Sequence, residues 1–482
     1  MNVLLASSEV HPYSKSGGLA DMVGALAKSL AKAGHQVGLV TPLYQGIFKQ
    51  YPALEKLDGR LDLPLGPDRV EAEIWALRPL DGLTIYFVDQ PQFFDRPGLY
   101  QENGVDYPDN PARFIFFSKA VVHVARYLAS QPEVLHVHDW HAGLIPVLVL
   151  HQRYTEEWAN APRTCLTIHN LAYQGNFSRA HYDLTNLPFG YFNSEGVEFY
   201  GGMNCLKAGI AYADAITTVS PRYAREITTE AFGCGLDGIL RRRQNALTGI
   251  LNGVDYDEWK TVKNPYLKHS YDVQNLGGKT AEKLELQAEL GLPVDPTIPL
   301  FGTVTRLVAQ KGVDILLGAL EEMLASNMQF VLLGSGLPVF EDAFQSLTAR
   351  FGTKVAVRIG FDQGLSHQIE AACDFYLMPS AFEPCGLNQM YSLCYGAIPI
   401  VRRTGGLDDS VIDAGENAQE ANGIKFTEYS TRAFAKAVRK ALLLYEDPQL
   451  LSHFRKNGMT ADFSWKRTTG EYVRVFRGIL ER

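Results

Sequence analysis

The sequence predicts an α/β protein made of two doubly wound units, each a parallel sheet with helices packed on it. Two observations carry this prediction. Over residues 2–41 a strand, a glycine-rich loop, a helix and a second strand follow one another, which is the repeating pattern of a doubly wound sheet. The same order returns from residue 299, and short apolar strands then recur at intervals of roughly 20–30 residues as far as residue 401.

The first unit opens with the apolar residues 2–7 and a loop, residues 8–18, that ends in Gly17-Gly18. Gly34 stands where a helix C-cap is expected, and Gln36–Thr41 reads as the second strand. The helix between them is predicted from apolar side chains spaced to share one face: Met22, Val23, Leu26, Ala27 and Leu30.

The second unit opens with a strand over Pro299–Val304 and a polar loop over Thr305–Gly312. Asp314 is expected to cap the helix that follows. The apolar face of that helix is expected to include Ile315, Leu316, Ala319 and Leu320. Further strands are expected at Phe330–Leu333, Val355–Ile359, Phe375–Met378 and Ile398–Val401.

These elements predict an N-terminal domain over residues 1–248 and a C-terminal domain over residues 249–457. Residues 458–482 are expected to form a terminal helix that could pack back on the N-terminal domain. Ligands of open α/β sheets bind at the carboxyl ends of the strands. Two such sheets facing each other would place both sets of loops on one cleft, which suits an enzyme with a phosphorylated donor and an acceptor.

The composition excludes several classes of protein. Hydrophobic residues make up 46% of the 482 residues and charged residues 20%, as in an ordinary globular chain. Lysine and arginine total 45 against 53 acidic residues, a net charge of −8 without a basic run, so neither nucleic acid nor a membrane is expected as a partner. The six cysteines form no C-x-x-C pair, and the N-terminus does not resemble a signal peptide. We therefore expect a cytoplasmic protein with reduced thiols; its oligomeric state is left open.

Two loops carry lysine or arginine together with glycine at the expected ends of strands. Lys15-Ser16-Gly17-Gly18-Leu19 could bring backbone amides and a cation to a phosphate, although a flexible turn with a solvated lysine would have the same residues. Arg306 and Lys311 could together neutralise a diphosphate leaving group, the alternative being two solvated cations on a surface loop.

The segment Phe382-Glu383-Pro384-Cys385-Gly386-Leu387 precedes a helical run that begins at Asn388. Free amides at such a helix start suit an anion such as diphosphate. Glu383 could meet a sugar hydroxyl or a positive transition state, or it could simply interact with the helix dipole.

Histidines cluster in His136-Val137-His138-Asp139-Trp140-His141. A metal site is one interpretation, but no further pair of ligands has a supporting spacing. We favour polar side chains at a strand end, with no metal. His169 ends a similar strand and could be a structural histidine. Gly233–Gly238 matches G-x-G-x-x-G but follows a predicted helix over Tyr223–Phe232 rather than a strand, which argues against a nicotinamide site.

Taken together, these motifs resemble those of bacterial glycogen synthases and plant starch synthases. Lys15 to Asp21 is similar to the family's K-T-G-G-L-[AG]-D signature. Further motifs match in order over almost the whole chain: His138-Asp139-Trp140, Thr167-Ile168-His169-Asn170, Asn252-Gly253-Val254-Asp255, Arg306-Leu307 with Gln310-Lys311-Gly312, Pro379-Ser380, Phe382 to Leu387, and Arg403-Thr404-Gly405-Gly406-Leu407.

The resemblance implies the glycosyltransferase B fold and retaining transfer of glucose from ADP-glucose to the non-reducing end of an α-1,4-glucan in glycogen biosynthesis, without a cofactor or metal. It implies catalytic roles for Glu383, Arg306, Lys311, His169 and Asp139. It implies donor contacts by Lys15, Gly18, Asp21, Asn252, Phe361, Cys385, Gly386, Leu387 and Thr404. Glucan contacts are expected from Tyr107, Asp109 and Asn110 within Asp106-Tyr107-Pro108-Asp109-Asn110.

The chain departs from the family pattern at several positions. Ser16 and Asn388 replace threonines, and Phe361 replaces a tyrosine that stacks on the base. Phe199–Lys207 differs from the family's Y-Y-N-x-x-S-F-L-K in a segment expected to border the acceptor.

Two mechanisms and several activities remain open from the sequence. Glu383 and Asp139 could act as the two carboxylates of a double displacement, but we favour front-face attack in which the leaving phosphate takes the acceptor's proton. The alternatives to an ADP-glucose enzyme are a transferase that uses UDP-glucose or is specialised for maltodextrins, and a catalytically silent glucan-binding protein.

Overall fold

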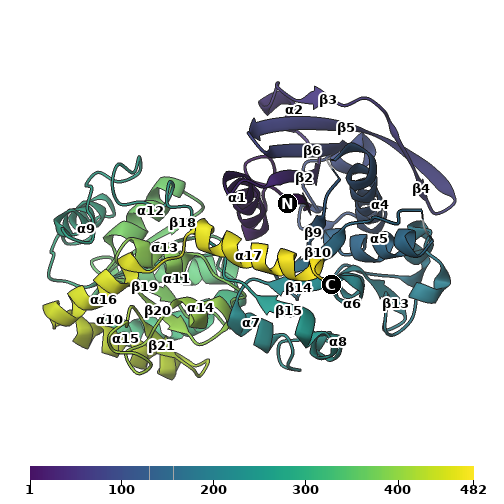
Figure 1. Ribbon diagram of the computed structural model, residues 1–482. Helices are drawn as coiled ribbons and strands as arrows, with labels where there is room; N and C mark the ends of the chain where they lie inside the picture. The colour runs from purple at the N-terminus through teal and green to yellow at the C-terminus, as the bar shows by residue number, and fades with distance from the viewer. Residues whose placement is uncertain (130, 156) are drawn as a thin grey trace. The chain divides into compact units, whose positions relative to one another are not determined.

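The computed structural model describes residues 1–129, 131–155 and 157–482 and divides into two compact units (Figure 1). The first unit comprises Met1–Val219, Ala224–Gly253 and Trp465–Arg482, and the second comprises Ser220–Tyr223 and Val254–Ser464. The main division thus follows Gly253, where the sequence places it after residue 248. Residues 458–464 of the expected terminal segment lie in the second unit, where Val254 N donates to Phe463 O at 2.7 Å.

The first unit contains, among its described residues, a ten-stranded sheet. Its centre is parallel, with β1 (Asn2–Ala6) between β2 (Gln36–Pro42) and β9 (Val134–His138). An antiparallel extension through β5 (Asp68–Leu80) continues one edge, which the sequence analysis did not predict. The order across the sheet is β15 (Leu247–Gly249), β14 (Ala215–Thr218), β10 (Arg163–Ile168), β9, β1, β2, β6 (Leu83–Asp89), β5 and β3 (Glu55–Lys56), with β4 (Leu61–Leu65) also paired to β5.

Helix α1 (Gly18–Lys32) packs with the five side chains of its predicted apolar face all buried, so this prediction is confirmed. Gly34 lies just beyond it at φ +87°, a left-handed position that glycine adopts without strain at a helix end. The C-terminal helix α17 (Trp465–Leu480), yellow in Figure 1, belongs to this unit. Thr469 Oγ1 of α17 donates to Ser29 Oγ of α1 at 2.7 Å.

The remaining short strands form two small sheets, β7 (Gln101–Glu102) with β8 (Val105–Asp106), and β11 (Asn176–Phe177) with β13 (Gly202–Asn204) and β12 (Glu198–Phe199). The other α-helices in this part of the chain are α2 (Ile47–Gln50), α3 (Pro91–Phe94), α4 (Asn110–His123), α5 (Ile145–Tyr154), α6 (Cys205–Tyr212), α7 (Pro221–Glu226) and α8 (Asp237–Arg242). A π-helix covers Val124–Leu128, and short 3-10 helices cover Trp140–Ala142, Arg179–Thr185, Phe189–Tyr191 and Gln244–Ala246.

The second unit holds a parallel sheet of six strands in the described chain, in the order β18-β17-β16-β19-β20-β21. Its five predicted strands are confirmed to within one residue at each end. They are β16 (Leu300–Val304), β17 (Gln329–Gly334), β18 (Val355–Ile359), β19 (Phe375–Met378) and β20 (Ile398–Arg402), and the sixth strand is β21 (Ile424–Phe426). The helices are α9 (Gly277–Glu289), α10 (Val313–Leu324), α11 (Pro338–Phe351), α12 (Gln363–Ala372), α13 (Asn388–Cys394), α14 (Gly405–Ser410), α15 (Thr431–Tyr445) and α16 (Pro448–Thr460).

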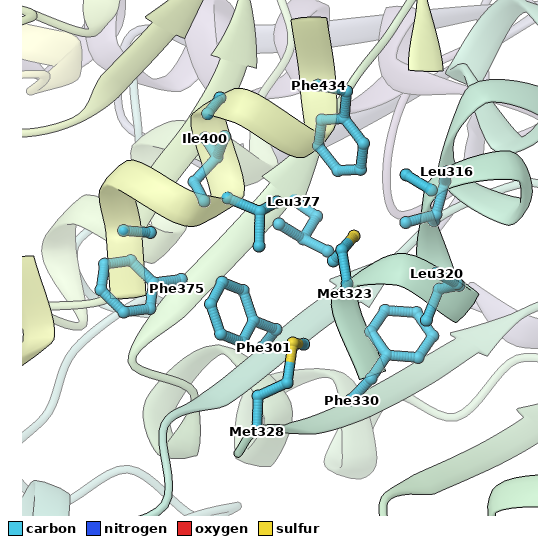
Figure 2. Packing of buried hydrophobic residues seen from close by; sticks show 14 of the residues in the cluster. Phe301, Leu316, Leu320, Met323, Met328, Phe330, Phe375, Leu377, Ile400 and Phe434 are labelled. Atoms are coloured by element: carbon cyan, nitrogen blue, oxygen red, sulfur yellow. The ribbon is translucent and has the colours of Figure 1, made fainter. Parts of the chain in front are cut away.

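An aromatic and aliphatic core fixes this sheet (Figure 2). Phe301 of β16 and Phe375 of β19 stack with ring centroids 5.0 Å apart. Leu316 and Leu320 of α10 and Phe434 of α15 are buried in the same cluster. The loops at the carboxyl ends of the strands are thus carried by a rigid, closely packed layer.

The predicted N-cap of α10 is wrong. Gly312 caps the helix at φ +71°, and a Cβ at this position would lie 2.0 Å from Pro379 O, so a side chain is sterically excluded. Asp314 lies in the first turn instead, and its carboxylate accepts a hydrogen bond from the Tyr429 hydroxyl at 2.5 Å.

All six cysteines are free thiols. Within the described ranges, no helix has both the length and the apolar character needed to cross a membrane.

Candidate active site

The loop after β16 carries the two cations predicted to hold a diphosphate. Leu307 N donates to Ser335 O at 2.8 Å, which anchors the loop to the end of β17. Arg306 is exposed, and its guanidinium has no hydrogen-bond or ion-pair partner among the described residues. This cation is therefore available to an anion at the carboxyl edge of the sheet.

Lys311 and Glu383, 72 positions apart in the sequence, form an ion pair. Lys311 Nζ lies 2.7 Å from Glu383 Oε2, and the side chains are 18% and 9% exposed. The Ser380 hydroxyl donates to the same carboxylate oxygen at 3.2 Å. The structure thus brings together two predicted catalytic residues, and the lysine compensates a nearly buried carboxylate.

The segment before α13 offers free amides. Gly386 has φ +68°, a left-handed conformation that favours glycine, and a Cβ there would crowd Gln389 Oε1 at 2.5 Å. Gln389 Nε2 holds the carbonyls of Cys385 and Gly386 at 3.1 and 3.2 Å. The amides of Gly386 and Leu387 have no acceptor among the described residues, as an anion site at a helix start requires.

Cys385 and Thr404, two predicted donor contacts, are only 6% and 1% exposed. Each can offer a ligand no more than a small surface.

Asn388 points away from the free amides. Its side-chain amide donates to Tyr376 Oη at 2.8 Å and to Val304 O at 3.1 Å. The Tyr376 hydroxyl also accepts from Val304 N at 2.9 Å. The residue that replaces the family's threonine therefore braces the end of β16, directly before the loop that carries Arg306.

Phe361, the predicted base-stacking residue, is 88% exposed and borders a cavity of about 480 Å³. The cavity lies at the carboxyl end of β18 and is also lined by Arg358 and Gln368. Strand β17 lies between β18 and β16, so two spacings of about 4.8 Å separate the cavity from the Arg306 loop. A nucleotide could place its base at Phe361 and its diphosphate at Arg306.

In the first unit, Lys15 lies beside Asp21, with Nζ 2.8 Å from Oδ1. Both side chains are partly exposed, at 50% and 33%. A Cβ on Gly17 or Gly18 would meet no atom within 4 Å, so this loop is open to a ligand.

Glu9 shapes the same loop and was missed by the sequence analysis. Its carboxylate accepts from the amides of Ser16 at 2.5 Å and Gly17 at 3.2 Å. The Tyr100 hydroxyl donates to it at 2.7 Å. Glu9 lies near the start of the loop that follows β1, so a carboxylate at the carboxyl end of this strand was the available signal.

Asp139 and His169 meet at the ends of β9 and β10. Asp139 is 7% exposed, and its Oδ1 accepts from His169 N at 2.8 Å. Its backbone has φ +55°, a strained conformation of the kind that collects at functional sites. Burial raises the pKa of Asp139 to about 7, although hydrogen bonds from the amides of His169 and Asn170 lower it. Burial also lowers the pKa of His169 to about 3, so its imidazole is neutral at physiological pH.

The other histidines are engaged by protein groups. His136 Nε2 lies 2.6 Å from Thr167 Oγ1, and His138 Nδ1 lies 3.1 Å from His169 Nε2. His141 stacks on Tyr100 with ring centroids 4.6 Å apart. Over residues 1–129, 131–155 and 157–482, no three His, Cys, Asp or Glu side chains are grouped so that they could hold a metal ion.

Asn252 lies at the end of the first unit and is 6% exposed. Its Oδ1 is buried and has no hydrogen-bond partner among the residues that the structure describes. An acceptor left without a donor carries a free-energy cost that a ligand hydroxyl would relieve.

The predicted glucan contacts hold their own loop together. Arg96 binds the carboxylate of Asp109 at 2.5 Å, and Arg113 donates to Asn110 Oδ1 at 2.6 Å. The guanidinium carbons of both arginines lie over the Tyr107 ring, at 4.8 and 5.0 Å from its centroid. The side chains of Asp109 and Asn110 are thus committed within the protein.

Replacing Asp139 with asparagine is expected to stabilise the protein at high pH. The pKa of Asp139 is raised from 3.8 to about 7, so below pH 4 the carboxyl is protonated in folded and unfolded chains alike. Above pH 7 the folded chain bears the cost of a buried charge, up to about 4 kcal/mol. The unfolding temperature of D139N should be higher than that of the natural protein at pH 8, and this difference should shrink as the pH falls toward 4.

Asp109→Asn provides the control with the opposite sign. Burial tends to raise the pKa of Asp109, but the hydrogen bond and charge of Arg96 lower it overall. The loss of stability in D109N should therefore grow as the pH rises through the Asp109 pKa. A stability difference for D139N that does not change with pH would contradict the assignment of a buried, costly charge.

Two Rossmann-like units, one with cations and free amides at the carboxyl edge of its sheet among the described residues and the other with buried polar side chains at its strand ends, define a glycosyltransferase of the B fold class. The comparisons with known proteins agree. Residues 2–242 match the starch synthase catalytic domain family, and residues 284–460 match the glycosyl transferases group 1 family. The chain belongs to the glycogen and starch synthase family.

Similar proteins cover the whole chain. A glycogen synthase of Anaeromyxobacter sp. (strain Fw109-5) is 44% identical over 480 residues, covering 99% of both chains. One from Syntrophotalea carbinolica is 42% identical and covers 100% of this chain and 99% of its own. The catalytic domain of starch synthase IV from Arabidopsis thaliana, solved with ADP and acarbose, has a TM-score of 0.88 at 32% identity, covering 100% of this chain and 99% of that one. A sucrose-phosphate synthase from Thermosynechococcus elongatus shares the fold, with a TM-score of 0.60 at 17% identity.

Proposed function

We propose that this protein is a cytoplasmic glycogen synthase that transfers glucose from ADP-glucose to the non-reducing end of an α-1,4-glucan with retention of configuration. The observation that carries the proposal is the cluster at the carboxyl edge of the second sheet. There the free guanidinium of Arg306, the Lys311–Glu383 pair and the free amides of Gly386 and Leu387 lie around the ends of β16 and β19. The similarity to a starch synthase catalytic domain solved with ADP and acarbose supports an adenine nucleotide as part of the donor.

In this proposal the leaving diphosphate is held by Arg306, Lys311 and the two amides. Negative charge grows on the diphosphate as the glycosidic bond breaks, so these groups bind the transition state more strongly than the ground state. Lys15 adds a further cation to the phosphates, beside Gly18 and Asp21. Phe361 covers the base.

Neither candidate carboxylate is a free anion at the site. Glu383 is held in an ion pair with Lys311, 2.7 Å away. Burial raises the pKa of Asp139 to about 7, which disfavours its carboxylate form. Both facts favour front-face attack, in which the acceptor hydroxyl adds to the anomeric carbon as the C–O bond to phosphate breaks. The leaving phosphate then takes the hydroxyl proton.

His169 and Asn252 are assigned to the hydroxyls of the transferred glucose. A neutral imidazole can donate to or accept from a sugar hydroxyl without adding charge to the site. The unpartnered Asn252 Oδ1 would accept from such a hydroxyl.

For the acceptor we propose an aromatic surface near the β12–β13 hairpin. Tyr200 and Gly201 form the turn of this hairpin, both with positive φ, and the Tyr200 ring is 87% exposed. Exposed aromatic faces suit sugar rings, because each combines an apolar face with a polar edge. Tyr107, Asp109 and Asn110 are all engaged by Arg96 and Arg113, so the exposed Tyr200 is the more available aromatic surface.

The deciding experiment mixes the purified protein with glycogen and either ADP-glucose or UDP-glucose and measures the nucleoside diphosphate released. ADP-glucose is expected to give the higher kcat/KM, since the Phe361 ring can cover a purine more fully than a pyrimidine. A higher value with UDP-glucose would overturn the donor assignment. No release with either donor, together with retained glycogen binding, would indicate a silent glucan-binding protein.

Turnover is expected to be the same in EDTA as in magnesium or manganese. Arg306, Lys311, Lys15 and helix-start amides can neutralise a diphosphate, so the proposal assigns no step to a divalent metal. The measurement is the initial rate after dialysis against EDTA, with and without added metal. Loss of activity in EDTA that magnesium or manganese restores would contradict this prediction.

A further inference from the structure

Helix α14 lies directly against the segment that carries Glu383. A Cβ on Gly405 would lie 2.0 Å from Glu383 O, and one on Gly406 would lie 2.0 Å from Cys385 O. Gly406 N donates to Glu383 O at 3.2 Å and to Pro384 O at 3.0 Å. The backbone on both sides of Pro384 therefore cannot shift unless α14 shifts with it.

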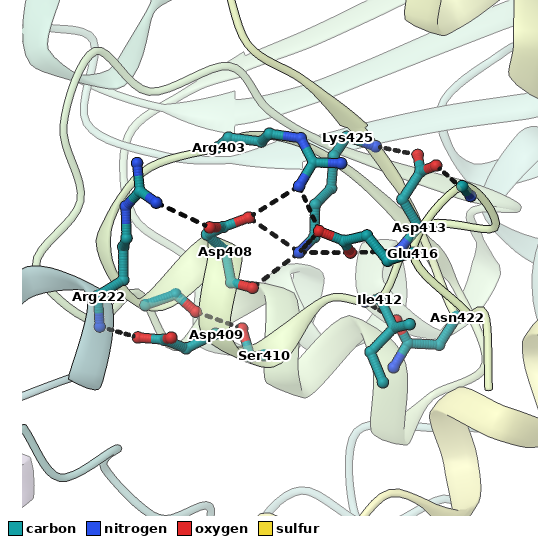
Figure 3. Close-up of polar contacts among 12 residues, drawn as sticks. Arg222, Arg403, Asp408, Asp409, Ser410, Ile412, Asp413, Glu416, Asn422 and Lys425 are labelled. Carbon is teal, nitrogen blue, oxygen red and sulfur yellow. Dashed lines mark hydrogen bonds and ion pairs between the residues drawn. The ribbon is translucent and has the colours of Figure 1, made fainter.

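A cluster of charged side chains surrounds Asp408 of α14 (Figure 3). Asp408 of α14 lies 2.9 Å from Lys425 Nζ, 3.4 Å from a guanidinium nitrogen of Arg403 and 3.7 Å from one of Arg222. Lys425 Nζ also donates to the backbone carbonyl of Asp408 at 2.8 Å. The Lys425 side chain, on β21, is only 3% exposed.

Glu416 completes the cluster by pairing with both Lys425, at 2.9 Å, and Arg403. Burial tends to raise the pKa of Glu416, but hydrogen bonds from Lys425 and Arg403 outweigh it and lower the pKa to about 2. Glu416 therefore stays ionised throughout the physiological pH range.

Residues 220–223, which belong to the second unit, also make hydrogen bonds to α14 and to Pro384. Arg222 N donates to the carboxylate of Asp409 at 2.6 Å, and the Ser220 hydroxyl donates to Pro384 O at 2.7 Å. The hydrogen bonds from Gly406 N and from the Ser220 hydroxyl therefore end on the same atom, Pro384 O. Pro384 directly follows Glu383, which pairs with Lys311.

We propose that the Lys425–Asp408 pair is a positioning device for the donor site: by fixing α14 it holds the backbone of Glu383 to Cys385 in the geometry that the nucleotide-sugar requires. Lys425 does not touch the substrate and acts only through α14. The inference rests on the proposed function. Its physical basis is that a misplacement of about 1 Å in a reacting geometry can cost about 10²-fold in rate, whereas a buried ion pair by itself is weak evidence for stability.

The test compares Lys425→Met with Lys283→Met, a matched control in the same unit. Lys283 pairs with Asp374 at 2.8 Å, and these side chains are 4% and 6% exposed. Asp374 also accepts from Leu300 N, at the amino end of β16, so this pair lies at the edge of the sheet opposite the donor site. Each substitution removes a buried lysine and leaves its aspartate with at least one arginine partner, Arg403 for Asp408 and Arg455 for Asp374. The two pairs differ in the part of the sheet that they hold.

Both variants are expected to unfold at lower temperature than the natural protein. At a temperature where circular dichroism shows both to be folded, K425M should lose at least about tenfold in kcat and show a raised KM for ADP-glucose. Its KM for glycogen should not change. K283M should keep its kcat and both KM values within about twofold.

Equal losses of turnover in the two variants, or an unchanged kcat in K425M, would overturn the positioning role. Should K425M fail to fold, Asp408→Asn provides the measurement, since it keeps the shape of the side chain while removing its charge. Lys425→Arg should recover much of the lost turnover by restoring a cation. Failure of the proposed function would appear differently, as absence of transfer in the natural protein.

Discussion

Replacing Lys311 with alanine is expected to lower turnover by about 10²–10³-fold, the usual cost of one preorganised electrostatic partner of a developing charge. It should also lower stability, by about 3 kcal/mol, because Glu383 is 9% exposed and would be left as a nearly buried charge without a partner. Turnover at saturating ADP-glucose and glycogen, together with thermal unfolding, measures the two effects.

The double variant Lys311→Ala/Glu383→Gln separates the effect on turnover from the effect on stability. Neutralising Glu383 should return most of the lost stability, because the uncompensated charge is gone. Turnover should stay low, since the diphosphate still lacks its cation. If K311A remains folded and retains more than about a third of the natural turnover, the leaving-group role is wrong.

Replacing Arg306 with alanine is expected to cost a similar 10²–10³-fold in turnover, but without a change in stability. Arg306 is exposed and has no partner among the described residues, and such surface substitutions usually change stability by less than about 0.5 kcal/mol. The contrast with Lys311 follows from the structure, since the two cations share a loop but only one of them is paired with a carboxylate.

Arg439→Ala is the control for the removal of an exposed arginine. Arg439 lies on α15, is 54% exposed and pairs only with Glu322 among the described residues. The substitution Arg439→Ala should leave both the turnover and the unfolding temperature unchanged. An R306A variant with near-natural turnover would show that Arg306 is a solvated surface cation.

The second sheet could be predicted closely because its strands are continuous apolar runs bounded by glycine or polar loops. Each of these strands is buried on both faces, so composition alone marks where it starts and stops. The antiparallel edge of the first sheet was missed for the opposite reason. Strand β5 is half-exposed, and its signal is an alternation in which Ala72, Ile74 and Ala76 are buried between exposed or half-buried neighbours.

The site residues could be predicted where their place directly after a strand or before a helix is enough to identify them. Arg306 and Lys311 follow a strand end, and the glycines of Gly17-Gly18 precede a helix. The pairing of Lys311 with Glu383 could not be predicted, because 72 residues separate them and no local spacing encodes the contact. The capture of Asp109 by Arg96 is of the same kind: it depends on how two loops pack and not on either motif.

The contact between Asn388 and Tyr376 has a consequence for how such enzymes can diverge. The buried Tyr376 hydroxyl receives a hydrogen bond at 2.8 Å from an amide that threonine, one atom shorter and without an NH₂ group, cannot supply. A lineage that exchanges one of these residues must therefore alter the other or lose the brace at Val304. Positions 376 and 388 should change together among relatives, and Asn388→Thr should be tolerated better alongside Tyr376→Phe than alone.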